Sequence, residues 1–240
     1  MCRKIFITLR YWISALRNLI FPRKCIVCDA LLDEDEQFLC GDCRFDIPLT
    51  YFWFWSDNPA KLRVSRFFPV TDVVALFFYR HESGYADILH KIKYEGNIRL
   101  GHEMGRLLGK EMAESGNFSD IQAIVPVPLH FARRFRRGYN QAEIIAGGVA
   151  RELGIPVLTD LLIRKHRTKT QVKLSPNERF ANVAQAFCVN QKALARYRQK
   201  GISHIIIFDD VLTTGATIAA AAAPLTASFE ITAVSLAAVE

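Results

Sequence analysis

The sequence has little of several features that mark particular classes of protein. It contains 13 glycines and 9 prolines in 240 residues, far below the content of collagen-like or low-complexity chains. Hydrophobic residues make up 50% of the chain and charged residues 23%, which excludes a disordered composition. We therefore expect a folded, soluble and mildly basic protein with a formal net charge of +7. A core of about 150–200 residues and one small additional module would account for the length.

A long uncharged hydrophobic run is also absent. Residues 1–21 are largely apolar, but four cationic residues interrupt them and no small-residue cleavage site follows, so neither a transmembrane helix nor a signal peptide is predicted. The interrupting residues are Arg3, Lys4, Arg10 and Arg17. The spacing predicts an amphipathic helix over 1–21 that packs on the rest of the protein, with attachment to a membrane surface as the alternative. Without an export signal, we expect a cytoplasmic protein.

Cysteines are few, but four of the six are regularly spaced. They form two CxxC pairs separated by eleven residues: Cys25, Cys28, Cys40 and Cys43. Each pair can present two thiolates from a tight turn, and two pairs complete a tetrahedral site, so the spacing predicts a structural zinc ion in a module of residues 22–50. An iron–sulfur centre stays open. Redox motifs are expected in a larger βαβ context, and disulfides in an exported chain.

Aromatic residues dominate the next segment, and regular alternation follows it. The run from Tyr51 to Pro59 predicts a hydrophobic cover over the junction between modules, within a linker of residues 51–71. We expect strands at 72–80, 121–125, 157–164, 186–189, 205–208 and from 231 onwards. Helices are expected at 86–94, 98–114, 141–153 and 191–199, and again after residue 217. This alternation predicts an α/β domain over 72–240, with a parallel sheet covered by helices on both faces.

One strand end carries residues suited to a sugar phosphate. Asp209 and Asp210 directly follow the apolar strand, and the turn Thr213 to Thr217 comes before a helix. Carboxylates there can accept hydrogen bonds from vicinal ribose hydroxyls or hold a divalent ion through water. The turn can wrap a phosphate with backbone N–H groups, and Gly215 permits close approach. Together they indicate a 5-phosphoribosyl group, the alternative being an ordinary helix start.

Several segments then carry a resemblance to known families. DDVLTTGAT (209–217) resembles the motif by which type I phosphoribosyltransferases bind 5-phosphoribosyl 1-pyrophosphate (PRPP). LHKIKYEGN (89–97), IVPVPLH (124–130), RRGYNQAE (136–143) and NERFANVAQAF (177–187) resemble the ComF family, which includes GntX-like proteins. That family places a zinc-binding cysteine module before a phosphoribosyltransferase domain, so the resemblance implies this fold here. Tyr139 stands where the family more often has Phe, and Pro224 should shorten the helix after the turn.

The resemblance implies a role for each segment. Asp209 and Asp210 would be the catalytic residues, and the whole PRPP motif would be Asp209, Asp210, Val211, Leu212, Thr213, Thr214, Gly215, Ala216 and Thr217. Pyrophosphate would bind a turn in which two prolines leave the remaining N–H groups pointing outward, together with two residues of an arginine-rich loop. These residues are Val125, Pro126, Val127, Pro128, Arg134 and Arg137. A mobile basic lid would contain Arg164, Arg167, Lys169 and Gln171.

The implied activity is transfer of a 5-phosphoribosyl group from Mg²⁺-bound PRPP to an acceptor that the sequence does not identify. Pyrophosphate would leave through an oxocarbenium-like transition state. The resemblance also implies a role in competence, DNA uptake and natural transformation, with competence-machinery proteins as partners. The alternative is a PRPP sensor without catalysis that binds single-stranded DNA, through its basic loops and through Tyr51, Phe52, Trp53 and Trp55 if those rings are exposed.

Overall fold

The structure is a computed structural model that describes residues 22–164 and 186–240. The expected amphipathic helix at 1–21 and the expected lid residues Arg167, Lys169 and Gln171 lie outside the described residues. Within the two described ranges, no helix is long and apolar enough to cross a membrane.

A four-stranded parallel sheet forms the centre of the fold, as predicted. Its order is β1 (Val73–Tyr79), β6 (Glu230–Val239), β5 (His204–Leu212) and β2 (Ala123–Pro126). All three neighbouring pairs are parallel. The strands are apolar along almost their whole length, because helices cover both faces of the sheet.

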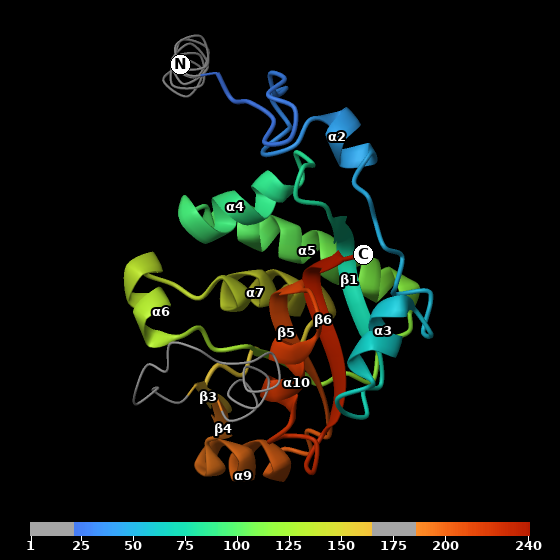
Figure 1. Cartoon of the computed structure of the whole chain (residues 1–240), viewed down its shortest axis with the longest axis vertical. Helices are drawn as coiled ribbons and strands as arrows, with labels where there is room; N and C mark the ends of the chain where they lie inside the picture. Colours follow the sequence, from blue (N-terminus) through green and yellow to red (C-terminus); the bar gives the residue numbers. More distant parts are fainter. Residues whose placement is uncertain (1–21, 165–185) are drawn as a thin grey trace, which may run out of the picture.

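The side chains of the sheet divide between two cores. On one face, Val74, Ile206 and Phe208 pack with α4 (Ala86–Tyr94), α5 (Ile98–Ser115) and α7 (Gln141–Leu153). On the other, Val73, Ile205 and Ile207 pack with α3 (Pro59–Val64), α9 (Gln191–Gln199) and α10 (Ala216–Ala222). Figure 1 shows these helices around the sheet. The alternation along each strand therefore places one hydrophobic core on each side.

Local capping explains why the helix predictions succeeded. Asn97, Asn140 and Asn190 each accept backbone N–H bonds at the start of α5, α7 and α9. Gly116 and Gly154 end α5 and α7 in the left-handed conformation. The predicted helices 86–94, 141–153 and 191–199 are confirmed at both ends. The expected shortening of the helix before Pro224 is also confirmed, because α10 ends at Ala222.

Helices α5 and α7 approach each other closely through glycines. A Cβ atom on Gly105 would lie 2.1 Å from the carbonyl oxygen of Ile145, and one on Gly148 would lie 2.3 Å from that of His102. Only glycine allows the two backbones to meet at this separation. The contact fixes α7, and so the loop before it, against α5.

Three strand and loop predictions are wrong. A turn at residues 159–160 divides the predicted strand 157–164: Val157 forms a parallel bridge with Ile124 of β2, and only Leu162–Arg164 form a strand, β3. β3 pairs antiparallel with β4 (Phe187–Val189) in a separate two-stranded sheet, outside the parallel one. The expected arginine-rich loop is a helix, α6 (Phe131–Arg137), which the His130 side chain caps and Gly138 ends.

The predicted end of the fifth strand is also wrong. β5 continues to Leu212 because it stays paired with β6, with Asp209 opposite Ser235 and Val211 opposite Ala237. The two acids therefore lie inside the last part of the strand and not beyond its end. Their backbone is held by the sheet, which fixes the directions of both side chains.

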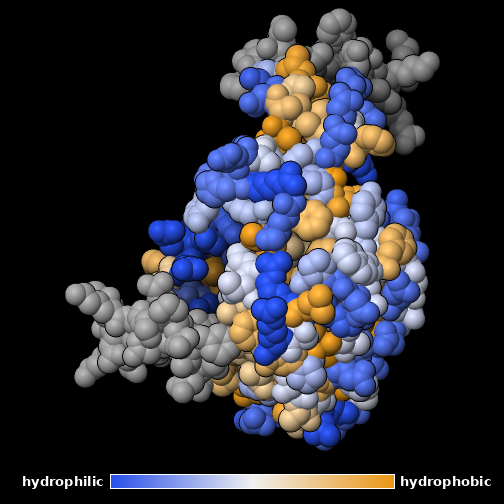
Figure 2. All heavy atoms as spheres, turned by 45° about the vertical axis from the view of Figure 1, so that its right-hand side comes forward, coloured by the Kyte–Doolittle hydropathy of each residue, from blue (hydrophilic) through white to orange (hydrophobic). Residues whose placement is uncertain are grey.

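The four-cysteine segment lies at one end of the molecule, with α2 (Gly41–Phe45) inside it (Figure 1). The hydroxyl of Tyr85 donates to the carbonyl of Cys43 at 2.8 Å, and a Cβ on Gly84 would lie 2.4 Å from the carbonyl oxygen of Val27. These contacts pack the four-cysteine segment against the loop that precedes α4. On the face shown in Figure 2, apolar side chains form small patches between polar ones.

The aromatic run after it is partly buried. Phe52 and Trp53 are buried in the two cores, whereas Tyr51 and Trp55 are 56% and 53% exposed. Two of the rings thus belong to the hydrophobic cores of the fold, and a cover over a junction between modules stays a prediction. The segment also contains α3, which Asn58 caps by accepting the N–H of Lys61 at 2.9 Å.

Candidate functional site

The two acids of β5 form the centre of the candidate site. Asp210 is buried, and its Oδ2 lies 3.1 Å from Nζ of Lys93 and accepts from Nε2 of Gln141 at 2.9 Å. Lys93 comes from the last turn of α4, and Gln141 is the first residue of α7. Oδ1 of Asp209 accepts the backbone N–H of Asp210 at 3.0 Å. Residues from three elements thus converge on one carboxylate pair.

The protonation of Asp209 differs from that of an ordinary aspartate. Burial, and then the negative charge of Asp210, raise the pKa of Asp209 to about 8, although Lys93 and Arg164 act in the opposite direction. Protonation of Asp209 is therefore favoured over that of an ordinary aspartate as long as no cation or donor occupies the site. A ligand that brings a cation or hydrogen-bond donors to the pair favours the ionised form.

The threonine-rich turn follows directly on β5. Gly215 begins α10 with φ of 83°, and a Cβ there would lie 2.9 Å from Cγ2 of Val64, so the position requires glycine. Thr213 and Thr214 are exposed, and Thr214 Oγ1 accepts the N–H of Ala216 at 3.3 Å. Val211 and Leu212 lie in the strand, and Thr217 is in α10. The turn presents hydroxyl groups beside the start of a helix.

An arginine supports this turn from behind. Arg63 of α3 donates to the carbonyl of Thr213 at 2.9 Å and to that of Val239 at 3.1 Å. A pocket of about 370 Å³ opens there, lined by Arg63, Arg66, Phe67, Thr213, Thr214 and Val239. The guanidinium group ties the turn to the end of β6 and adds positive charge near the exposed threonines.

The proline-containing turn lies beside the acid pair, because Pro126 of β2 pairs with Phe208 of β5. The expectation that its N–H groups point outward is wrong at Val127, whose N–H donates to the carbonyl of Phe208 at 2.8 Å. The carbonyl of Val127 accepts from Nδ2 of Asn140 at 3.1 Å. The turn is therefore held rigidly between β5 and the start of α7. Val125 lies within β2.

The expected cationic residues occupy different positions around this turn. Arg137 donates through Nη1 to Oε1 of Gln141 at 2.9 Å. Gln141 in turn donates to Asp210, so Arg137 is connected to the acid pair through Gln141. Arg164 donates to the carbonyl of Pro128 at 3.4 Å and lies over the ring of Phe187. Arg134 is exposed on α6. The structure thus brings Arg137 and Arg164 to the edge of the site and leaves Arg134 on the surface.

The four predicted cysteines form a compact cluster. Their sulfur atoms lie within 4.8 Å of one another, and Sγ of Cys28 is 3.6 Å from Sγ of Cys40. A tetrahedral zinc ion with bonds of about 2.3 Å requires sulfur atoms about 3.8 Å apart, so the cluster can bind a metal such as zinc. Burial raises the pKa of Cys25, but hydrogen bonds from the backbone of Cys40, Cys28 and Val27 lower it to about 7 overall.

Comparison with known proteins shows to which family the chain belongs. No family model matches the chain. Competence protein F of Haemophilus influenzae is 32% identical over 213 residues, which cover 82% of this chain and 88% of that protein. The DNA utilization protein YhgH of Escherichia coli K12 is 30% identical over 198 residues, or 81% of this chain and 80% of that protein. The chain belongs to the ComF-like family.

Sequence reasoning missed three site residues of this ComF-like chain. Lys93, Gln141 and Arg63 had no assigned role, although Lys93 and Gln141 lie in the KIKYEGN and RRGYNQAE segments that carry the resemblance. Those segments were the available signal for the first two. Arg63 lies in a helix that the sequence did not predict, and its contact with Thr213 joins residues far apart in the chain.

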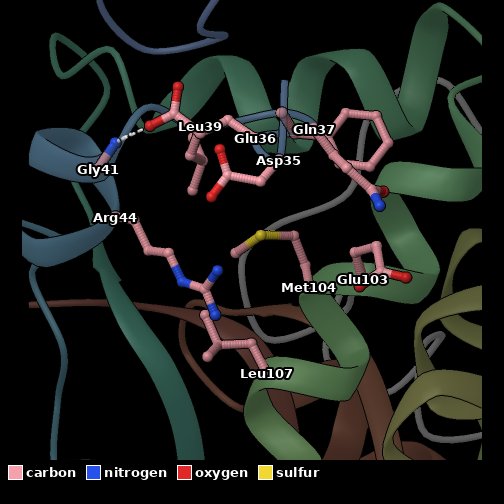
Figure 3. Close-up of a pocket in the computed structure, with 10 residues that line it drawn as sticks. Asp35, Glu36, Gln37, Leu39, Gly41, Arg44, Glu103, Met104 and Leu107 are labelled. Atoms are coloured by element: carbon pink, nitrogen blue, oxygen red, sulfur yellow. Dashed lines mark hydrogen bonds between the residues drawn. The ribbon is translucent and has the colours of Figure 1, made fainter. Parts of the chain in front are cut away.

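A second pocket in this ComF-like chain lies away from the acid pair. It has a volume of about 330 Å³ and lies between the four-cysteine segment and α5. Figure 3 shows Asp35 and Glu36 on one side and Glu103 and Met104 of α5 on the other, with Arg44 reaching in from α2. The pocket contains three carboxylates and one guanidinium group, and this excess of negative charge makes it unsuited to a polyphosphate.

Proposed function

We propose that the protein binds Mg²⁺ and PRPP at Asp209, Asp210 and the turn Thr213–Thr217. It transfers the 5-phosphoribosyl group to an acceptor and releases pyrophosphate. The observation that carries this proposal is the placement of two adjacent acids, of which Asp210 is buried and paired with Lys93, directly before a turn with exposed threonines and an obligatory glycine. The names of the relatives, competence protein F and DNA utilization protein, support a role in competence or DNA utilization.

Each group has a defined task in this reaction. The carboxylates of Asp209 and Asp210 accept hydrogen bonds from the two ribose hydroxyls, and carboxylate oxygens are also the ligands that Mg²⁺ prefers. The hydroxyl and N–H groups of Thr213–Thr217 bind the 5-phosphate. When bound, Mg²⁺ neutralises charge on the pyrophosphate. Arg137 and Arg164, beside the proline turn, stabilise the same leaving group.

The bond changes at the ribose are simple. The bond between C1 and the pyrophosphate oxygen breaks with its electron pair on pyrophosphate, and a bond from the acceptor to C1 forms. Positive charge develops on the sugar in between. The protein residues hold both phosphate groups and the hydroxyls, so that C1 faces the acceptor. This is the catalytic chemistry that a type I phosphoribosyltransferase fold over residues 72–240 would perform.

The cysteine cluster has a structural task in the same proposal. One zinc ion bound by Cys25, Cys28, Cys40 and Cys43 would use all four thiolates, which leaves no open coordination position for catalysis. The ion would fold residues 22–50 as a module, because the segment buries few side chains of its own. Because the hydroxyl of Tyr85 donates to the carbonyl of Cys43, the folded module would also hold the start of α4 in position.

A second candidate function uses the same PRPP site without catalysis. In it the protein senses PRPP and binds single-stranded DNA, a role supported by the name DNA utilization protein and by the exposed arginines of α6. The expected stacking platform of four rings is reduced, because Phe52 and Trp53 are buried and only Tyr51 and Trp55 remain accessible. Pyrophosphate release from PRPP, with a cell extract as the source of acceptor, separates the two functions.

The binding site is tested by ligand-induced stabilisation. PRPP with Mg²⁺ at about 100 times its Kd should stabilise the native state by about 2.7 kcal/mol, or roughly 5–10 °C in Tm. The double substitution Asp209→Asn and Asp210→Asn should abolish the shift. Asp57→Asn, at an exposed position outside the site, is the matched control and should keep it. An unchanged shift in the double variant would show that PRPP binds elsewhere.

A further inference from the structure

The turn that follows β5 is held from one side by helix α3. Arg63 donates through Nη1 to the carbonyl oxygen of Thr213 at 2.9 Å and through Nη2 to that of Val239 at 3.1 Å. The next residue of the helix, Val64, packs against Gly215, where a Cβ atom would lie 2.9 Å from its Cγ2. Two successive residues of α3 therefore contact the turn, one by hydrogen bonding and one by close approach.

The guanidinium group of Arg63 bridges the point at which two strands separate. β5 pairs with β6 as far as Leu212 and Ala238, and the turn begins at the next residue, Thr213. β6 continues to Val239, so one strand goes on where the other turns away. Beyond the last pair the sheet no longer fixes the Thr213 carbonyl. Arg63 fixes it instead, because its planar fork of donors reaches both chains.

Helix α3 itself has a fixed position on the sheet (Figure 1). The residue that caps it, Asn58, is fully buried, and its Nδ2 donates to the carbonyl of Val73 in β1 at 2.9 Å. Ala60 and Val64 are also fully buried and belong to the core on this face. Because the helix is anchored at its cap and along its buried side, Arg63 can hold a backbone group in one orientation.

The orientation of the Thr213 carbonyl determines that of the following N–H group. In a trans peptide the C=O and the next N–H point in opposite directions, so the N–H of Thr214 points away from Arg63. Asp210 lies on the opposite side, because its partners come from α4 and α7, which cover the other face of the sheet from α3. Within the described residues, the N–H groups of Thr214 and Gly215 donate no hydrogen bond.

We propose that Arg63 is a positioning residue that makes the site selective for a ribose with a 5-phosphate. Arg63 does not touch the ligand. It holds the peptide between Thr213 and Thr214 so that the free N–H groups of the turn face the phosphate oxygens, which accept from them. The inference rests on the proposed binding of PRPP and adds a substrate class to it: a ribose without a 5-phosphate gains nothing from Arg63.

Isothermal titration calorimetry with two probes separates this role from general damage to the site. PRPP with Mg²⁺ has the 5-phosphate, whereas pyrophosphate with Mg²⁺ lacks it. Arg63→Met should weaken PRPP binding by roughly 10- to 100-fold, the usual cost of losing a hydrogen bond to a charged group, and should leave pyrophosphate binding unchanged. The matched control is Arg198→Met, an exposed arginine on α9, which should bind both probes as the unsubstituted protein does.

Arg63→Lys distinguishes orientation of the peptide from positive charge alone. Lysine keeps the charge, but its single ammonium group lacks the planar fork that reaches the carbonyls of both Thr213 and Val239. Its PRPP affinity should therefore stay close to that of Arg63→Met. Urea unfolding of both variants measures the stability that each has lost, and their unchanged pyrophosphate binding shows that the rest of the site is folded.

Three results would overturn the inference. The first is an unchanged PRPP affinity in Arg63→Met. The second is an equal loss of affinity for both probes, which would make the role of Arg63 merely structural. The third is full PRPP affinity in Arg63→Lys, which would make charge the only contribution. Failure of the proposed function gives a different pattern: the unsubstituted protein would not bind PRPP, or the double substitution Asp209→Asn and Asp210→Asn would leave its PRPP affinity unchanged.

Discussion

Lys93 and Asp210 form an ion pair in which Nζ lies 3.1 Å from Oδ2. The lysine comes from the end of α4 and the aspartate from the last part of β5, so the pair joins a covering helix to the acid pair of the sheet. Both side chains are largely shielded from water, which strengthens their attraction. The ammonium group of Lys93 thus offsets the negative charge that the Asp210 carboxylate brings into the fold.

The first prediction removes this cation. Lys93→Met should weaken PRPP binding by roughly 5- to 100-fold, because a charge-assisted interaction of about 1–3 kcal/mol is lost at the acid pair. Lys91→Met on the same helix removes only a surface pair with Glu95 and should leave PRPP affinity unchanged. Calorimetric titration with PRPP and Mg²⁺ measures both. Equal affinities in the two variants would mean that Lys93 does not support the ligand site.

The second prediction follows from the raised pKa of Asp209. Its folded-state pKa of about 8 exceeds the usual 3.8, so the native state binds an extra proton between these values. The stability contributed by this protonation is present below about pH 4 and is lost as the pH rises towards 8. Asparagine cannot ionise, so Asp209→Asn avoids this loss of stability at high pH. Its Tm should exceed that of the unsubstituted protein by a few degrees at pH 8 and by little at pH 4.

Thermal unfolding of both proteins between pH 4 and pH 8, without ligand, measures how this difference in Tm changes with pH. Asp57→Asn, at an exposed position outside the site, is the control for the substitution itself and should leave the Tm unchanged. A constant difference between Asp209→Asn and the unsubstituted protein across the range would contradict the raised pKa. PRPP binding by Asp209→Asn should be impaired at all pH values, so stability and function would change in opposite directions.

The third prediction concerns the contact between α5 and α7. Gly105→Ala should destabilise the fold by about 2–4 kcal/mol, because its Cβ would lie 2.1 Å from the carbonyl oxygen of Ile145 and the helices must separate. Gly147→Ala is the control on α7, since its Cβ would meet only the ring of His102, at 3.1 Å, and that side chain can turn away. Urea unfolding of both variants measures the difference. A similar cost for the two would contradict the close helix contact.

The fourth prediction concerns the metal. The purified protein should contain about one equivalent of zinc, and Cys40→Ser should lose it and disorder residues 22–50. Cys188→Ser, a cysteine outside the cluster, should retain the metal. Elemental analysis decides both. Less than about half an equivalent of zinc, with iron in its place, would show that the cluster holds an iron–sulfur centre.

Much of the fold could be predicted because its signals are local. The ends of α7 and α9 follow from periodicity and from the asparagine caps before them, and the end of α4 follows from the turn residues Glu95 to Asn97. The cysteine cluster follows from two CxxC spacings, since each turn brings its own pair of sulfur atoms together. The acids and the threonine turn are also contiguous, so the sequence alone places them next to one another. These features depend on residues fewer than 20 positions apart in the sequence.

The tertiary structure decided the features that join distant segments. Continued pairing with β6 extends β5 through both acids, and the neighbouring β5 takes the N–H of Val127. Lys93 and Gln141 meet at Asp210 only because α4 and α7 pack on the same face of the sheet. Strand register and helix packing depend on side-chain fit between elements far apart in the chain, and no local pattern encodes that fit.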